Sequence, residues 1–222
     1  MIEAIFWSQK DFEPANEADL IRKAYAAIKA GPIRELEPAT NADAKALDSA
    51  VEGLAVELIH PDYSPANGYE NSTIALASGY EPANKRYLIH MGIHLEDRED
   101  PVAAGWRAGL RLAPAIAQSF EVELGFMNGS NADDDRQPYP SEKSLRRAEI
   151  PALTAWTFIG SARLDRKKRE ILEAIGAPHC LPLGEGWQIR LVENLFDEPD
   201  PELLDRLEAL EAGGLAYFGP RK

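Results

Sequence analysis

The amino-acid sequence predicts an α+β fold in which helices pack against a mixed or antiparallel sheet. Segments with alternating apolar residues, typical of half-buried strands, occur along the whole chain. Segments with the apolar spacing of amphipathic helices lie between some of them, but the two kinds do not alternate strictly, as they would in a doubly wound parallel sheet. With 222 residues, of which 45% are hydrophobic, the chain is expected to form a single domain over residues 1–222.

The N-terminal half is expected to begin with a strand and to contain a hairpin. Strands are predicted at 2–7, 55–59, 72–77 and 86–95, and helices at 16–30 and 41–54. The strand at 86–95 is the clearest, because Tyr87, Ile89 and Met91 alternate with more polar residues. It is expected to pair with 72–77, since only a short turn separates the two segments.

The C-terminal half is expected to contain two strand–helix pairs after a long polar excursion. A helix is predicted to begin at Asp100–Pro101, because an acidic N-cap followed by proline is a typical helix start, and Pro114 is expected to kink or interrupt it. The polar stretch 128–149 is predicted to be a loop excursion. The remaining predicted elements are strands at 121–127, 154–159 and 187–192 and helices at 165–176 and 200–213.

The charge of the chain narrows the classes of partner. There are 24 Lys and Arg residues against 37 Asp and Glu, which gives a formal net charge of −13. Such a charge repels nucleic acid and anionic membranes, so neither is expected as a partner, and it speeds encounter with a basic protein surface. No segment has the roughly 20 consecutive apolar residues of a membrane-spanning helix, and Cys180 is the single cysteine. The cytoplasm is therefore the expected location.

Motifs of catalysis and cofactor binding are missing from the sequence. It contains no Gly-rich phosphate loop, no H-E-x-x-H and no G-x-S-x-G, so neither an enzyme nor a cofactor or metal site is expected. His90 and His94 lie on one face of a predicted strand but roughly 13 Å apart, too far to share one zinc ion. An enzyme with an unrecognised site around His60, Asp62 and His90 stays open as an alternative.

Aromatic residues and the cysteine are interpreted as structural. The three tryptophans that fall within predicted helices or strands are expected in the core: Trp106, Trp156 and Trp187. Cys180 follows His179, but adjacency in sequence does not place a thiol against an imidazole in the way that nucleophilic catalysis needs. Cys180 is expected to be a small buried hydrophobic residue.

The C-terminal third resembles a known family of binding proteins. The segment 187–197, which ends in Phe196–Asp197, and the Asp200–Pro201 helix start before Gly214–Leu215 are similar to the end of bacterial toxin-immunity proteins of the immunity protein 52 family. Trp156 and Phe6–Trp7 resemble two further family positions, with Ala155 and Ser8 in place of glycines. The resemblance implies an α+β protein that blocks a cognate toxin, often a nuclease domain delivered by a type VI secretion system, and implies core positions for Phe196 and Leu215.

Charge and resemblance together predict that this protein binds a toxin with a basic surface and occludes its active or substrate-binding surface. Loop carboxylates able to reach a partner are the candidate contacts, namely Asp133, Asp134, Asp135, Asp197 and Glu198. The Asp133–Asp135 run lacks the acidic residue spacing, glycine and terminal glutamate of a calcium loop, so it is not predicted to bind calcium. An adaptor subunit of a secretion or phage-like assembly stays open beside the enzyme alternative.

Overall fold

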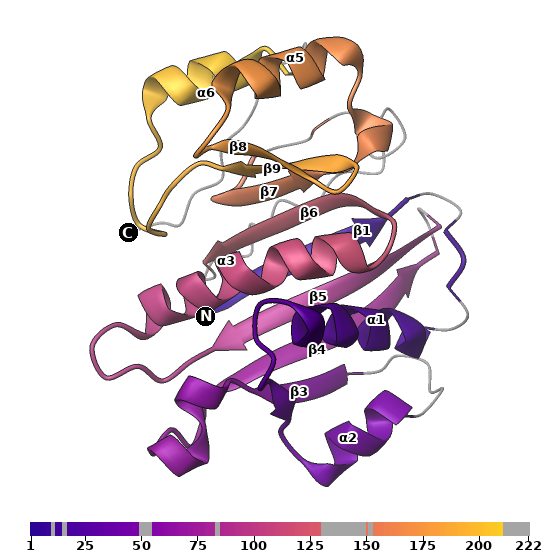
Figure 1. The fold of residues 1–222 in the computed structure, drawn as a ribbon, viewed down its shortest axis with the longest axis vertical. Helices are drawn as coiled ribbons and strands as arrows, with labels where there is room; N and C mark the ends of the chain where they lie inside the picture. Colours follow the sequence, from indigo (N-terminus) through magenta and orange to yellow (C-terminus); the bar gives the residue numbers. More distant parts are fainter. Residues whose placement is uncertain are drawn as a thin grey trace.

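One antiparallel sheet extends through the whole described part of the chain (Figure 1). The computed structural model describes residues 1–9, 12–14, 17–48, 55–82, 85–129, 150 and 153–210. In these residues nine strands follow one another across the sheet in the order β2-β3-β4-β5-β1-β6-β7-β9-β8. Their bounds are β1 Ile2–Ser8, β2 Glu37–Pro38, β3 Ala55–Ile59, β4 Thr73–Glu81, β5 Arg86–His94, β6 Val122–Gly129, β7 Trp156–Ile159, β8 Cys180–Leu183 and β9 Gly186–Arg190. The predicted α+β class is confirmed.

The helices confirm most of the predicted positions. They are α1 Glu17–Ala30, α2 Asn41–Asp48, α3 Pro101–Ser119, α5 Arg166–Ile175 and α6 Pro201–Glu208, with short 3-10 helices η1 Pro61–Tyr63, η2 Pro65–Asn67 and η3 Ser161–Arg163. Asp100, Asp165 and Asp200 cap three of these helices, since each carboxylate accepts hydrogen bonds from backbone N–H groups of the first turn. The rest of the predicted second helix, 49–54, and of the polar excursion, 130–149, lies outside the described residues.

Several predicted boundaries are wrong. β6 includes residues 128 and 129 of the predicted polar excursion, and α6 ends at Glu208, before the predicted end at 213. The predicted interruption at Pro114 is absent, since α3 continues through it to Ser119. Residues on both sides of the proline, among them Leu112 and Ile116, are fully buried and hold the helix against the core. Strand β4 extends to Glu81, four residues beyond the predicted end at 77. The rings of the cross-strand pair Tyr80 and Tyr87 lie 4.7 Å apart and extend the predicted hairpin.

The first strand of the chain lies in the middle of the sheet. Ile2 of β1 pairs with Ile93 of β5 on one side and with Gly129 of β6 on the other. Helix α3 crosses these three strands at close range, because a Cβ atom added at Gly109 would come within 2.6 Å of the sulfur of Met127. The main hydrophobic core therefore forms between the central strands and the layer of α1 and α3 in front of them (Figure 1).

A smaller apolar cluster occupies the opposite face of the central strands. It consists of Ile5, Trp7, Leu124 and Phe126, with Leu88 packed beside them. The alternation of side chains along β1 separates the two faces, since Ala4 and Phe6 belong to the main core while Ile5 and Trp7 belong to this second cluster. The central strands are thus apolar on both faces, which explains their dense apolar sequences.

Strands β7, β9 and β8 continue the sheet toward α5 and α6, which pack on one another and form the upper layer in Figure 1. The prediction that three tryptophans belong to the core is confirmed, since Trp106, Trp156 and Trp187 are at most 8% exposed. The indole of Trp156 also donates from Nε1 to Oε1 of Gln188 at 3.1 Å. Each large apolar ring therefore serves the fold.

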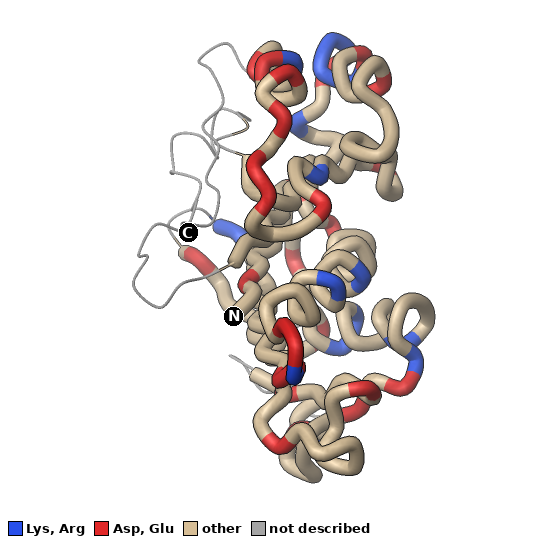
Figure 2. The backbone as a smooth tube through the Cα atoms, turned by 90° about the vertical axis from the view of Figure 1, so that its left-hand side faces the viewer, with Lys and Arg blue, Asp and Glu red and all other residues tan. Residues whose placement is uncertain are grey.

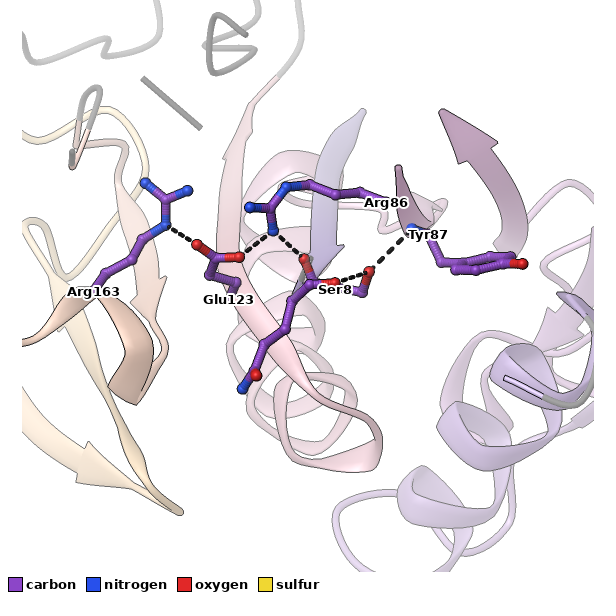
Figure 3. Close-up of polar contacts among 6 residues, drawn as sticks. Ser8, Arg86, Tyr87, Glu123 and Arg163 are labelled. Atoms are coloured by element: carbon purple, nitrogen blue, oxygen red, sulfur yellow. Dashed lines mark hydrogen bonds and ion pairs between the residues drawn. The ribbon is translucent and has the colours of Figure 1, made fainter. Parts of the chain in front are cut away.

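A buried cluster of charges joins this C-terminal part to the central strands (Figure 3). The carboxylate of Glu123 in β6 lies between two guanidinium groups, that of Arg86 in β5 and that of Arg163 in η3, and Nε of Arg163 is 2.7 Å from its Oε1. All three residues are at most 5% exposed. The guanidinium of Arg86 also donates to the carbonyl of Ser8 at 2.5 Å. Glu123 therefore neutralises part of two buried positive charges at once.

Replacing Glu123 by glutamine is expected to destabilise the protein by about 3 to 5 kcal/mol, because it removes the carboxylate and leaves two buried guanidinium charges facing one another. Urea unfolding followed by circular dichroism measures the change. Glu170→Gln is the matched control, since Glu170 pairs with Arg166 at 2.7 Å on the exposed surface of α5. The control is expected to leave the midpoint nearly unchanged, and an equal loss in both variants would contradict the special role of Glu123.

Candidate interaction site

The segment between β9 and α6 contains two of the predicted partner contacts. Asp197 and Glu198 are both exposed there, together with Glu193, and we call residues 193–198 the acidic loop. Exposed acidic side chains continue into α6 at Asp200, Glu202, Asp205 and Glu208. Figure 2, which draws Asp and Glu in red, shows several red stretches in the upper half of the molecule, where α5 and α6 lie in Figure 1. The neighbouring helix α5 begins with the basic run 166–169, but it also carries Glu170 and Glu173, and α6 carries Arg206, so both helices have charges of both signs.

Hydrogen bonds fix the base of the acidic loop. The indole of Trp106 in α3 donates from Nε1 to the carbonyl of Glu193 at 3.0 Å. The guanidinium of Arg190 donates to the carbonyls of Val192 at 3.1 Å and Glu193 at 3.0 Å. Leu195 is only 3% exposed and belongs to the main core. The loop is therefore attached to α3, to β9 and to the core, and it leaves the sheet in one defined direction.

A tight turn forms the tip of the acidic loop. The backbone N–H of Asp197 donates to the carbonyl of Asn194 at 3.0 Å. In return, Oδ2 of Asp197 accepts hydrogen bonds from the backbone N–H of Asn194 at 3.1 Å and from its side-chain amide at 3.0 Å. Asn and Asp favour such turns for this reason. Asp197 thus shapes the loop through one carboxylate oxygen.

Phe196 lies at the tip of this turn and is 46% exposed, so the expectation that it belongs to the core is wrong. Leu195 takes the buried position, because the two residues at the tip of a tight turn direct their side chains differently and only one of them reaches the core. The turn-forming residues Asn194 and Asp197 around Leu–Phe are the sequence signal that indicates this arrangement. The other expected core residue of this kind, Leu215, lies outside the described residues.

The remaining predicted contacts, Asp133, Asp134 and Asp135, lie outside the described residues. Within the described ranges, no group of three or more His, Cys, Asp or Glu side chains is arranged to hold a metal ion. None of the helices in those ranges is both long and apolar enough to span a membrane. The acidic loop is therefore the part of the predicted interface whose geometry is defined.

The alternative catalytic residues His60, Asp62 and His90 do not form one site. His60 is buried, and its Nδ1 accepts a hydrogen bond from the backbone N–H of Asp62 at 3.2 Å, while Asp62 itself is exposed. Ala77 pairs with both Ala55 and His90. His60 is five residues beyond Ala55 along β3, so the two histidines are separated by roughly 17 Å along the strand direction.

The two histidines also lie on different faces of the sheet. His90 pairs directly with Ile5, and directly paired residues share a face, so His90 lies on the side of the second apolar cluster. The ring of His60 lies 5.3 Å from that of Tyr63, which packs against the main core. His90 therefore cannot act together with His60 and Asp62. Of the three residues, only His60 and Asp62 lie close together, and a turn joins them.

Cys180 is buried at the start of β8, as predicted. Burial raises the pKa of its thiol to about 12, and the guanidinium of Arg206 opposes this only in part. His179 instead places Nδ1 at 2.9 Å from the carbonyl of Arg190. A thiol with such a pKa is protonated at neutral pH and is a poor nucleophile, so the adjacent histidine and cysteine serve the structure.

Comparison with known proteins defines the class of this chain at the level of its fold. No protein family model matches the sequence, and no curated protein matches it. The chain shares its α+β fold with a solved structure, Pseudomonas aeruginosa T6SS protein PA0821, with a TM-score of 0.50 and 12% sequence identity. The match covers 100% of this chain and 76% of the other. At this identity the likeness concerns the fold alone.

The stability of the protein is expected to fall on acidification partly because of His60. Burial lowers the pKa of His60 below 6.5, the nearby guanidinium of Arg111 acts in the same direction, and Asp62 opposes them. Below about pH 6.5 the imidazole of His60 is protonated in the unfolded chain but stays neutral in the folded protein. The free energy of unfolding therefore decreases as pH falls. His60→Asn keeps an acceptor for the turn and is expected to lose less stability than wild type between about pH 7 and about pH 5. Urea unfolding at each pH measures the stability of both proteins. An equal loss of stability in wild type and in His60→Asn would contradict the role given to His60.

Cys180 is expected to resist alkylation by iodoacetamide in the folded protein near pH 8, because its thiol is buried and protonated. In urea the same thiol is expected to react at the rate of an ordinary exposed cysteine. Mass spectrometry of the labelled fraction over time measures both rates. Fast labelling without denaturant would show that the thiol is accessible and that its raised pKa is wrong.

Proposed function

We propose that this chain is an immunity protein that binds a cognate bacterial toxin in the cytoplasm and neutralises it by covering its active or substrate-binding surface. The observation that carries the proposal is the exposed acidic loop, whose base is held in place by Trp106 and Arg190, on a chain with a net charge of −13. A fold shared with a solved T6SS protein is compatible with this role. The resemblance of the C-terminal third to the immunity protein 52 family supports the same role. The proposal gives the protein no catalytic residue and no cofactor.

Charge indicates what kind of toxin surface the protein fits. With a net charge of −13, the chain is attracted to basic surfaces, and the clefts of nucleases are basic because they bind phosphates. The acidic loop presents its carboxylates on a backbone that Trp106 and Arg190 already hold in place. A preformed loop loses little conformational entropy on binding, which favours affinity. A nuclease-type toxin is therefore the proposed partner.

The second candidate is an adaptor in a secretion assembly. The similar solved structure is described only as a T6SS protein, and that description fits an adaptor as well as an immunity protein. The two functions differ in what they do to a cell. An immunity protein restores growth when the product of the adjacent reading frame is expressed, whereas an adaptor copurifies with components of the assembly and leaves toxicity unchanged. Coexpression of the two genes in a host that lacks both therefore tests the proposal directly.

Charge reversal at the proposed contacts is expected to weaken binding to the adjacent gene product by at least about tenfold at low salt, and by less at high salt, because screening reduces the lost attraction. The variant carries lysine at Asp133, Asp134, Asp135 and Glu198, and it leaves Asp197 in place because that residue closes the turn. Isothermal titration calorimetry measures the affinities.

The control for this experiment is Glu57→Lys, which reverses an exposed charge on β3, far from the acidic loop across the sheet. It is expected to bind nearly as wild type does. If the multiple lysine variant keeps full affinity at both salt concentrations, the proposed carboxylates are not the interface.

A further inference from the structure

The exposure of Phe196 stands out against the other exposed apolar side chains of the described residues. Four large hydrophobic residues are exposed there: Met1, Tyr80, Leu181 and Phe196. Tyr80 stacks on Tyr87, and Leu181 is part of the edge strand β8. Phe196 makes no ring contact with any aromatic residue in the described ranges. Phe196 belongs to neither hydrophobic cluster, and 46% of its surface stays exposed.

The turn that carries Phe196 is more strongly fixed than an ordinary surface loop. Three hydrogen bonds between Asn194 and Asp197 close it, and the neighbouring Leu195 is anchored in the core. Single exposed apolar residues are common on protein surfaces. A phenylalanine held at the tip of a closed turn is different, because its backbone is already ordered before any partner arrives.

Phe196 has acidic residues on both sides of it in the sequence. Glu193 precedes it by three residues, and Asp197 and Glu198 follow it directly, all of them exposed. An aromatic centre with a polar rim is the usual composition of a binding hot spot. The carboxylates repel phosphate backbones and anionic lipids, so a protein with basic side chains around an apolar pocket is the complementary surface.

We propose that Phe196 is the hydrophobic anchor of the toxin interface, and that its ring enters an apolar pocket whose rim carries lysine or arginine side chains. The inference rests on the proposed function and adds to it a division of roles within the acidic loop. Phe196 supplies most of the binding free energy and slows dissociation. Glu193 and Glu198 speed encounter and orient the partner.

The test measures the affinity of purified variants for the purified product of the adjacent reading frame by calorimetry. Phe196→Ala is expected to weaken binding by at least about 30-fold at low and at high salt alike, as loss of a hot-spot residue does. Glu198→Gln is expected to weaken binding mainly at low salt. Leu181→Ala removes another exposed apolar side chain and is the matched control, with affinity near that of wild type.

Stability is checked in parallel by thermal unfolding. Phe196→Ala is expected to lower the melting temperature only slightly, since 46% of the residue is exposed and it belongs to neither hydrophobic cluster, so that much weaker binding reports the interface. Suppose that wild type binds and that Phe196→Ala binds within about twofold of it. Phe196 is then not the anchor, while the proposed function still stands. If wild type neither binds nor neutralises the adjacent gene product, the proposed function itself fails, and the anchor with it.

Discussion

The position of Glu123 between two buried arginines ties together segments that are distant in the sequence. Arg86 begins β5, Glu123 lies in β6, and Arg163 ends η3, just before α5. Buried charges tolerate little displacement, because each one depends on the others for compensation. The cluster therefore fixes where the C-terminal strands and helices sit on the central sheet. The sheet in turn determines where β9 ends and the acidic loop begins.

A second attachment acts on the other side of the same C-terminal part. Trp106 belongs to α3, which packs across the central strands, and its indole holds the carbonyl of Glu193. The acidic loop is thus positioned by the same helix that covers the main core. Rigid support of this kind is what distinguishes a preorganised interface from a flexible acidic tail, and it makes a defined set of contacts possible.

Much of the fold is predictable from the sequence, because alternation along 86–95 and the capping aspartates at Asp100, Asp165 and Asp200 are local signals. The edge strands β2 and β8 are not, since each is short and contains a proline, Pro38 or Pro182, which argues against a strand. Proline is tolerated there because an edge strand has one side without strand partners.

Less of the candidate site than of the fold can be predicted from the sequence. Asp197 and Glu198 were identifiable as loop carboxylates, but the choice of Leu195 over Phe196 for the core depends on the direction in which the turn leaves β9. The charged cluster is hidden for a related reason. Arg86 and Glu123 occupy positions that a strand pattern assigns to solvent, and only the assembled sheet shows that they are buried.

The central place of β1 has a consequence for how the chain reaches this structure during synthesis. β1 leaves the ribosome before both of its partners, because Ile2 pairs with Ile93 and Gly129, which are translated much later. Until those residues are made, the apolar segment of β1 has no strand partner on either side in the nascent chain. Pairing across such a distance in sequence slows folding and prolongs the time during which this strand is open to aggregation or to chaperones. Under the proposed immunity role, slow maturation is a particular burden, because such a protein has to be folded before its toxin acts.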